Sequence, residues 1–370
     1  MKILITGAGG FIGKNLAAEL KNQGYDDLLL VTRETAPEVL EEYCRDCEFV
    51  YHLAGVNRSE RAEDFMEGNF GLLRELVERM NRSGNNAPLL FASSIQAERE
   101  NPYGNSKRAA EEYLQNVSEK TGRRILIYRL GNVYGKWCRP NYNSVVATFC
   151  HNIARDLPIQ INDPNASLNL LYIDDVVAEL IAALKGITKR CDSGYYFVAL
   201  SEEITLGRLA ELLYSFRESR KNLSLPDMKD KFTRELYATY LSYLPEQEFA
   251  YPLKMNLDAR GSFTEFLRTE DRGQVSVNIS KPGITKGNHW HHTKNEKFLV
   301  VRGEGIIRFR RLNTDEVIEY RVNGDELQVV DIPTGYTHNI TNTGTDDMVT
   351  IMWASEPFDP ERPDTYFLEV

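Results

Sequence analysis

The sequence predicts a doubly wound, parallel α/β domain followed by an all-β domain. Three observations support this prediction. Short apolar strands alternate with helical patterns over the first part of the chain, which is typical of a parallel sheet covered by helices on both faces. After residue 256, strand candidates recur roughly every 8–12 residues between glycine and Asx turns, as in a sandwich or barrel. The length of 370 residues also favours about two domains.

The element boundaries follow from changes in this pattern. Parallel strands are expected at 3–6, 28–32, 49–54, 89–93 and 125–130, with helices at 11–22, 63–82, 105–120 and 206–220. Pro245 and Pro252 then interrupt the periodicity, so we expect a first domain over 1–245, a linker over 246–255 and a second domain over 256–370. Strands of the second domain are expected at 263–269, 273–281, 296–310, 316–322, 327–333 and 348–354.

The charge balance limits the possible partners. A net charge of −10 argues against a nucleic-acid partner, because phosphate binding requires a basic face. No apolar run approaches the ~18 residues of a membrane span and no signal peptide is visible, so we expect a cytoplasmic protein without a membrane partner. The five cysteines are scattered, and we interpret Cys44 and Cys47 as two reduced thiols, with a redox switch or a partial metal site as the alternative.

A glycine motif follows the first strand and precedes the first helix. Residues 6–13 read TGAGGFIG and contain G-x-x-G-x-x-G. The glycines permit a tight turn and let the backbone approach a pyrophosphate at the helix N-terminus. In this strand–turn–helix context the motif predicts a Rossmann-type dinucleotide site. Its expected cofactor contacts are Gly7, Gly10, Phe11, Ile12 and Gly13.

The end of the second strand predicts which dinucleotide binds. An NAD site usually presents an acidic residue there for the ribose hydroxyls, whereas this chain has Thr32 and Arg33. Arg33 could pair with a 2′-phosphate, so we expect NADPH as the cofactor. Glu34 could compete for the guanidinium, and the alternative is that Arg33 is a solvated surface charge.

Tyr103 and Lys107 form the expected reaction centre. Asn101 can cap a helix whose first position is a proline, which places Tyr103 and Lys107 on one face at i and i+4. An ammonium beside a phenol lowers the pKa of the phenol. Tyr103 is therefore expected to give a proton to a carbonyl oxygen as hydride arrives. Ser93 or Ser94, at the end of a strand, can hydrogen-bond the same oxygen, and we favour Ser94.

These motifs resemble the nucleotide-sugar branch of the extended short-chain dehydrogenase/reductase family. The resemblance covers roughly residues 1–245 and implies that Leu53, Ala54 and Lys107 contact the cofactor. Ser94 and Tyr103 are separated by a shorter loop than is usual in the family, which we expect to shorten one wall of the substrate pocket. The matching segments are the glycine motif, His-Leu-Ala at 52–54 (after the family's fourth strand), Ser-Ser at 93–94, Tyr-Gly-Asn-Ser-Lys at 103–107, Asn69, 132–135 and 172–176.

A histidine cluster marks the second domain. His289 and His291 are two residues apart, so on a strand they point to one face. Glu296 follows across a short turn, and His338 lies on a distant strand. Imidazoles with a carboxylate suit Zn²⁺, and also Fe or Mn, so we expect one divalent metal with Zn²⁺ preferred. His292 is expected to point away, and the alternative is a set of histidines packed without metal.

The spacing of these residues resembles the two motifs of the cupin family, which implies an all-β jelly roll. The first motif matches in full from Gly283 to Gly303. The second matches from Pro333 to Asn342, but Gly324 lies too early to be its leading glycine.

Over its full length the chain resembles the bifunctional reductase–epimerases of bacterial capsule and O-antigen synthesis (CapF type). This resemblance implies two steps on a UDP-linked 4-keto-6-deoxy amino sugar, on the route to UDP-N-acetyl-L-fucosamine. The cupin domain epimerises C3, and the reductase domain reduces the C4 ketone with NADPH to UDP-2-acetamido-2,6-dideoxy-β-L-talose. We also expect a homodimer. The segments that carry the resemblance are 135–150, 238–245, 276–301 and 364–370.

The chemistry of the substrate fits this order of steps. A C3 proton is acidic only while the C4 ketone can stabilise the enolate, so epimerisation must precede reduction. Three alternatives stay open: a reductase whose second domain only binds sugar or builds the oligomer, an NADP-sensing regulator without turnover, and a metal-dependent dioxygenase. The base of the epimerisation is not assigned, although Lys286 and Tyr336 lie near the motifs.

Overall fold

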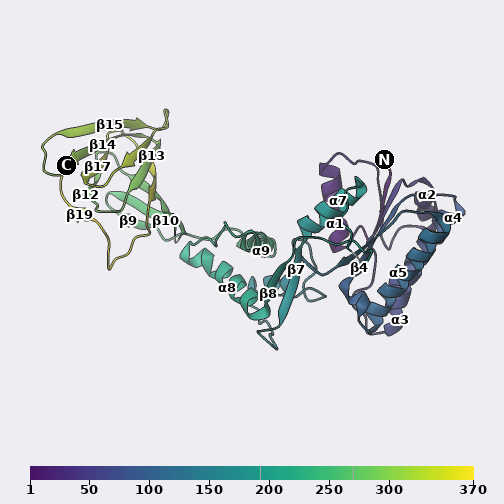
Figure 1. The fold of residues 1–370 in the computed structure, drawn as a ribbon. Helices are drawn as coiled ribbons and strands as arrows, with labels where there is room; N and C mark the ends of the chain where they lie inside the picture. Colours follow the sequence, from purple (N-terminus) through teal and green to yellow (C-terminus); the bar gives the residue numbers. More distant parts are fainter. Residues whose placement is uncertain (192, 270) are drawn as a thin grey trace. The chain divides into compact units, whose positions relative to one another are not determined.

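The structure is a computed structural model that describes residues 1–191, 193–269 and 271–370. The chain forms two compact units (Figure 1). The first comprises Met1–Tyr214 and Asp230–Pro245, and the second comprises Ser215–Lys229 and Glu246–Val370.

The first unit is built on a parallel sheet with the strand order β2-β1-β3-β4-β5. This order confirms the predicted doubly wound fold. It reverses between β1 and β3, and in such sheets ligands bind beyond the carboxyl ends of the strands at the reversal. The His-Leu-Ala segment at 52–54 begins with the last residue of β3, which is the third strand along this chain and not a fourth. The strands are β1 (Ile3–Thr6), β2 (Leu28–Val31), β3 (Phe49–His52), β4 (Leu89–Ser94) and β5 (Ile125–Leu130).

Helices cover both faces of this sheet (Figure 1). One buried core joins the sheet to α1 and α7, and a second core joins it to α2, α4 and α5. Strands β1, β3 and β4 are fully buried because neither face is left to water, whereas the edge strand β2 is only partly buried. The bounds are α1 (Phe11–Asn22), α2 (Pro37–Asp46), α4 (Leu72–Arg82), α5 (Pro102–Thr121) and α7 (Ile173–Leu184).

The helix expected over 63–82 is interrupted. It consists of α3 (Ala62–Phe65), a π-helical turn η1 (Met66–Gly71) and α4. Such π turns are rare and occur often at functional sites. The wide turn carries the buried Asn69, which is considered below with the site.

The remaining elements of the first unit lie after β4. A short 3₁₀ helix follows β4, and a small sheet in the order β6-β7-β8 follows β5. Their bounds are η2 (Ile95–Glu98), β6 (Asn132–Tyr134), α6 (Val145–Ile153), β7 (Ser167–Tyr172), β8 (Glu202–Thr205) and α9 (Lys231–Leu241); α8 runs from Leu206 to Asn222.

The second unit consists mainly of two antiparallel sheets, which confirms the predicted all-β class. Their orders are β16-β13-β18-β11-β10-β9 and β15-β14-β17-β12-β19. Buried side chains from strands of both sheets form one hydrophobic core. The bounds are η3 (Glu246–Glu248), β9 (Asn256–Asp258), β10 (Gly261–Thr269), β11 (Gly273–Ser280), β12 (Thr285–Trp290), β13 (Glu296–Arg302), β14 (Glu304–Arg311), β15 (Val317–Asn323), β16 (Val329–Ile332), β17 (Tyr336–Asn342), β18 (Met348–Ala354) and β19 (Tyr366–Phe367).

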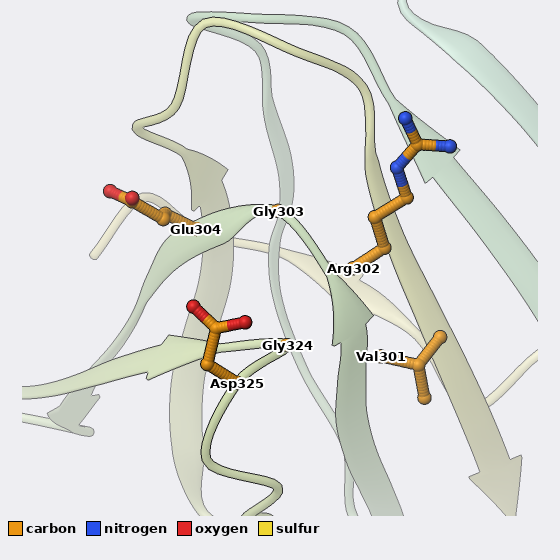
Figure 2. Close-up of a pocket in the computed structure, with 6 residues that line it drawn as sticks. All are labelled: Val301, Arg302, Gly303, Glu304, Gly324 and Asp325. Atoms are coloured by element: carbon orange, nitrogen blue, oxygen red, sulfur yellow. The ribbon is translucent and has the colours of Figure 1, made fainter.

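Gly303 divides the single strand expected over 296–310 into β13 and β14. Its φ of +83° is a left-handed conformation that favours glycine. The amide of Gly324 donates to the carbonyl of Gly303 at 3.1 Å, and a Cβ at Gly324 would lie 2.8 Å from the Cα of Arg302. Figure 2 shows the small hollow lined by the turns at 301–304 and 324–325.

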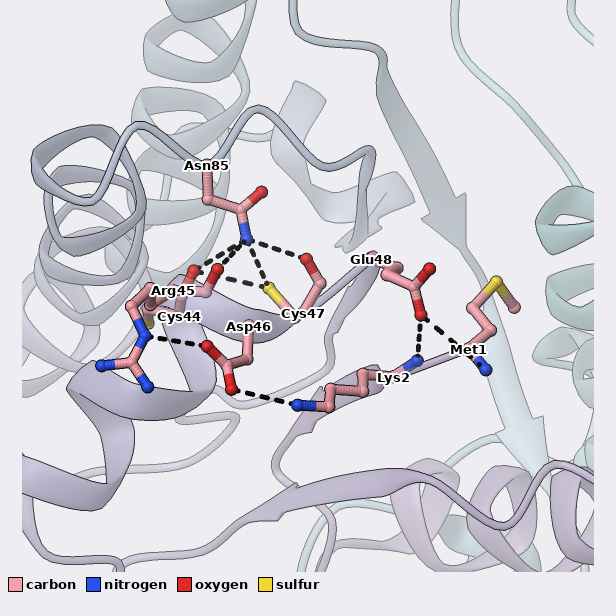
Figure 3. A network of polar contacts seen from close by, with 8 residues as sticks. All are labelled: Met1, Lys2, Cys44, Arg45, Asp46, Cys47, Glu48 and Asn85. Atoms are coloured by element: carbon pink, nitrogen blue, oxygen red, sulfur yellow. Dashed lines mark hydrogen bonds and ion pairs between the residues drawn. The ribbon is translucent and has the colours of Figure 1, made fainter.

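Cys44 and Cys47 are free, buried thiols held among polar groups near the N-terminus (Figure 3). The amide of Asn85 donates to the carbonyls of Cys44 and Cys47 at 2.9 and 2.8 Å. Burial raises the pKa of the Cys44 thiol to about 12 and that of the Cys47 thiol to about 11. The thiols therefore stay protonated and unreactive at neutral pH, in agreement with the reduced pair expected.

The described part of the chain contains no helix that is both long enough and apolar enough to cross a lipid bilayer.

Candidate functional site

The glycine motif packs directly against the end of β3. Gly7 has a φ of +68°, and a Cβ there would lie 2.7 Å from the amide nitrogen of Ala54. A Cβ at Gly13 would lie 2.2 Å from the carbonyl oxygen of Gly7. Only glycine fits at these two positions. Because glycine has no side chain, a ligand can approach the backbone of the loop directly.

The first turn of α1 offers free amides to an anion. Gly10 is the N-cap of α1 and supplies no side-chain oxygen, and the first turn contains no acidic residue. Unsatisfied N–H groups and the helix dipole favour a negative charge at this end. This arrangement suits the pyrophosphate of a dinucleotide.

One cavity of about 1420 Å³ brings together every site residue that the sequence predicted for the first domain. Small-molecule sites commonly have volumes of ~300–1,000 Å³, so this cavity has room for a dinucleotide and a second ligand. It is lined by Gly7, Gly10, Phe11, Ile12, Gly13, Arg33, Leu53, Ala54, Ser94, Tyr103 and Lys107, among others.

Arg33 lies exposed just beyond β2, on the wall of this cavity. Its guanidinium has no side-chain partner within the described residues. Glu34 also lines the cavity, and its amide donates to the hydroxyl of Thr32 at 3.3 Å. Arg33 is thus available to a phosphate at the place where the sequence predicted one.

Tyr103, in the first turn of α5, lines the cavity together with Ser94 at the end of β4. Burial raises the pKa of the Tyr103 phenol, and interaction with Ser94 partly opposes this rise. The expectation that Lys107 lowers this pKa was wrong. The ammonium lies 5.9 Å from the centre of the phenol ring, and burial, not the ammonium, sets the direction of the shift. Tyr103 therefore holds its proton and can donate it.

Lys107 is held by β4. Its ammonium donates to the carbonyl of Ala92 at 3.0 Å and lies 4.9 Å from the centre of the Phe91 ring. Burial lowers the pKa of Lys107 to about 8, while Glu111 acts in the opposite direction. The i, i+4 spacing places the side chains of Tyr103 and Lys107 in one cavity, but the Lys107 ammonium is hydrogen-bonded to β4 and not to Tyr103.

Ser93 and Ser94 point to different partners. The hydroxyl of Ser93 donates to the carboxylate of Glu111 at 2.5 Å, inside the protein. Glu111 also pairs with Arg129 at 2.7 Å. Ser93 is therefore occupied in a buried network, and Ser94 is the serine beside Tyr103.

Asn69 connects the cavity wall to α5. Its carboxamide accepts from the amide of Val56 at 2.8 Å and donates to the carbonyl of Val56 at 3.0 Å. It also donates to the hydroxyl of Ser106 at 2.9 Å. The π turn therefore fixes the segment after β3 against the helix that carries Tyr103 and Lys107.

One wall of the cavity includes a loop in which the sequence predicted no site residue, although segment 135–150 carries part of the family resemblance. Loop 135–144 lines it through several residues, among them Trp137. Trp137 and Asn141 have φ values of +68° and +54°, and such strained positions often accompany function. The hydroxyl of Tyr243 fixes the loop by donating to the carbonyl of Cys138 at 2.6 Å. Neither strained residue is glycine, so their residue types did not indicate these positive φ values.

The second unit gathers the four predicted metal ligands. The ligand atoms of these residues all lie within 4.8 Å of one another. The Nε2 atoms of His291 and His338 lie 3.4 and 3.2 Å from a carboxylate oxygen of Glu296, and the rings of His289 and His338 are 4.5 Å apart. The set is His289, His291, Glu296 and His338.

The protonation of this cluster suits a cation. Burial lowers the pKa of His289 to about 4, so its imidazole is neutral. Burial alone would raise the pKa of Glu296, but the neighbouring imidazoles of His291 and His338 hold it below its ordinary value. The Nδ1 atom of His338 is buried without a hydrogen-bond partner among the described residues, while its Nε2 atom faces Glu296 at 3.2 Å. Buried polar atoms of this kind require a partner, and a divalent metal supplies one.

Local backbone geometry aims these ligands. A register shift in β12 between Gly287 and His289, with Asn288 at a φ of +58°, turns His289 toward His338 on β17. His292 is exposed and its ring packs against Tyr366, so it lies outside the cluster as expected.

Two family descriptions match the chain. Residues 3–192 match the NAD dependent epimerase/dehydratase family, and residues 256–366 match the polysaccharide biosynthesis C-terminal domain. The two matches cover the parallel sheet of the first unit and the antiparallel sheets of the second.

Known proteins match over the full length. The UDP-2-acetamido-2,6-beta-L-arabino-hexul-4-ose reductase of Pseudomonas aeruginosa is 49% identical over 100% of this chain and 99% of its own length. The crystal structure of the capsular polysaccharide assembling protein CapF from Staphylococcus aureus covers 100% of both chains, with 55% identity and a TM-score of 0.94. A UDP-glucose 4-epimerase from Thermotoga maritima shares the fold over 66% of this chain, at 21% identity and a TM-score of 0.53. The chain therefore belongs to the CapF family of polysaccharide-synthesis proteins, in which an epimerase/dehydratase-type domain precedes a polysaccharide biosynthesis C-terminal domain.

Proposed function

We propose that the first unit reduces the C4 ketone of a UDP-linked 4-keto-6-deoxy amino sugar with NADPH. One observation carries this proposal: a single cavity is lined both by the glycine motif (residues 6–13, hereafter the glycine cradle) and by Ser94, Tyr103 and Lys107. The name of the P. aeruginosa relative, a reductase of a UDP-linked hexulose, points to the same substrate class.

The roles of the side chains follow from their geometry. NADPH, when bound, supplies a hydride to C4 of the sugar. The phenol of Tyr103 gives its proton to the ketone oxygen, which becomes the C4 hydroxyl. Ser94 hydrogen-bonds the same oxygen and holds it beside Tyr103. Lys107, fixed on the carbonyl of Ala92, places a positive charge near the phenolate that Tyr103 leaves behind.

We propose that the second unit is a cupin-type C3 epimerase that holds one divalent metal, with Zn²⁺ preferred. His289, His291, Glu296 and His338 would be its ligands. A metal at this place could polarise the C4 ketone and thereby acidify C3, or could stabilise the unit. The enolate requires the ketone, so epimerisation comes first and reduction then gives UDP-2-acetamido-2,6-dideoxy-β-L-talose.

Incubation of the 4-keto sugar in D₂O, with and without NADPH, tests both halves by NMR. Deuterium should enter C3 without NADPH, and the C4 alcohol should form only with it. Absence of deuterium at C3 in the enzyme-treated sugar would favour the alternative, in which the second unit only binds sugar or builds the oligomer. The homodimer also stays a proposal, and analytical ultracentrifugation would test it.

A further inference from the structure

The last residues of the chain run along the histidine cluster. We call residues 363–369 the C-terminal strap. Its short strand β19 pairs with the end of β12, where Phe367 lies opposite His289. The amide of Leu368 donates to the carbonyl of Asn288 at 3.0 Å, at the bulge that turns His289. The carbonyl of Leu368 also accepts from the hydroxyl of Thr337, the residue before His338.

Asp364 anchors the strap to the turn after His291. Its carboxylate accepts from the amides of His292, Thr293 and Lys294 at 3.0, 2.9 and 2.8 Å. Three amides converging on one carboxylate fix the turn more firmly than a single bond can. Asp364 also has a φ of +40°, a conformation that an aspartate holds only when its surroundings impose it.

The backbone of Asp364 decides which nitrogen of His291 can bind a cation. The Nδ1 atom of His291 lies 2.5 Å from the carbonyl oxygen of Asp364. A carbonyl can only accept, so Nδ1 carries the proton and Nε2 is left with its lone pair. This Nε2 atom faces Glu296 inside the cluster. A hydrogen bond of this kind fixes the tautomer and the ring orientation of a histidine ligand.

Lys294, in the turn after His291, has its ammonium hydrogen-bonded to the strap. Its side chain is buried, and its ammonium donates to the carbonyl of Pro363 at 2.5 Å and to the hydroxyl of Thr365 at 3.1 Å. Both partners belong to the strap. Without the strap, a buried cation would lose these acceptors, which is costly in a protein interior.

We propose that the C-terminal strap sets the metal affinity of the second unit, with Asp364 as the positioning residue that presents Nε2 of His291. The inference rests on the proposed metal site. It adds that residues far from the ligands in sequence determine how well that site binds.

The test compares Zn²⁺ dissociation constants of full-length proteins by competition with a chromophoric chelator. Asp364→Gly removes the carboxylate but accepts the positive φ, so it isolates the anchor from backbone strain. We expect its affinity to fall about 10- to 100-fold, the usual effect of losing a group that orients a metal ligand. Asp364→Asn keeps one acceptor oxygen and should fall between this variant and the wild type.

Asp359→Ala is the matched control. Within the part of the chain that the structure describes, its carboxylate pairs only locally, with the amide of Glu361 and the guanidinium of Arg362. It should bind Zn²⁺ as the wild type does. If the wild type binds no metal, the proposed metal site is wrong. If the wild type binds and both Asp364 variants bind equally well, the role of the strap is refuted.

A second measurement does not depend on metal. In chelator-treated protein with ¹⁵N-labelled histidine, the wild-type His291 should show a proton on Nδ1. In Asp364→Gly the population should shift toward a proton on Nε2, because the carbonyl of residue 364 is no longer held in place. Identical tautomers in the two proteins would contradict the positioning role, even if Asp364→Gly had weaker affinity through a general loss of stability.

Discussion

The hydroxyl of Ser93 donates a 2.5 Å hydrogen bond to the carboxylate of Glu111, so it is not available to a ligand in the way the hydroxyl of Ser94 is. Only Ser94 remains to bind a ketone oxygen beside Tyr103. Ser94→Ala should therefore lower kcat/KM for the reduction about 10- to 100-fold, an ordinary loss for one hydrogen bond made to developing charge. Ser93→Ala is the control: it should lower the melting temperature and change the rate much less. The reverse ranking would exchange the roles of the two serines.

Tyr103→Phe should remove the proton donor and leave the fold in place. The phenol keeps its proton because burial raises its pKa, so the loss should be close to the ~10²–10⁴-fold that general acid catalysis provides. Exchange of deuterium into C3 should continue. Tyr113→Phe, on the same helix and packed edge-on against Phe70, is the control. Near-normal NADPH oxidation by Tyr103→Phe would remove Tyr103 from the mechanism.

Lys107 should make the stability of the first unit depend on pH. Its pKa is lowered to about 8 by burial, whereas in the unfolded chain it is about 10.4. Between these values the unfolded chain binds more protons, so the free energy of unfolding should rise with pH through this window. Lys107→Met has no ammonium to titrate, so it does not gain stability in this window. Its stability relative to the wild type should therefore fall by roughly 2–3 kcal/mol from pH 7 to pH 10.

Urea denaturation at several pH values measures this difference. Lys120→Met, at the exposed end of the same helix, is the control and should show a constant difference from the wild type. A constant difference for Lys107→Met as well would mean that its ammonium is not destabilised by burial.

The parts of the site that the sequence predicted correctly are set by local geometry. In the glycine cradle, a Cβ at Gly13 would lie 2.2 Å from the carbonyl oxygen of Gly7, a contact within the strand–turn–helix segment itself. The helix that carries Tyr103 begins with the predicted cap, in which Asn101 accepts from the amide of Gly104 at 2.8 Å. Such features need only a few neighbouring residues, so a sequence pattern is enough to predict them.

The parts that the sequence missed depend on contacts distant in the chain. The raised pKa of Tyr103 and the attachment of Lys107 to Ala92 depend on burial by several strands, which the i, i+4 spacing cannot report. The bond from His291 to Asp364 joins residues 73 positions apart. Asp364 also adopts a positive φ without being glycine, so its residue type did not indicate this backbone conformation.

Arg33 should discriminate between the two nicotinamide cofactors. Only NADPH carries a 2′-phosphate, and hydrogen bonds to a charged group contribute about 1.5–3 kcal/mol. Arg33→Ala should therefore raise the dissociation constant for NADPH about 10- to 100-fold and leave that for NADH nearly unchanged, as measured by fluorescence titration. Arg82→Ala, outside the cavity lining, should affect neither cofactor. Equal losses for NADPH and NADH would show that Arg33 does not contact the 2′-phosphate.

His338 should be essential to the metal site and dispensable for reduction. Its Nε2 atom faces Glu296 inside the cluster at 3.2 Å, and its Nδ1 atom is buried without a hydrogen-bond partner among the described residues, so a metal would gain a ligand from this ring. His338→Ala should lose the ion, and the melting transition of the second unit should fall to that of chelator-treated wild type, since binding stabilises only the state that holds the ligands. Metal analysis and calorimetry on the full chain measure both effects.

His292→Ala is the matched control for this variant, because His292 is adjacent to the cluster but packs against Trp290 and Tyr366. It should keep its metal. Reduction of an already epimerised 4-keto sugar should survive in both variants, because Tyr103 and the glycine cradle lie in the first unit. Full metal content in His338→Ala would remove His338 from the ligand set. Loss of that reduction in His338→Ala, with the first unit still folded, would refute the division of the two steps between the units.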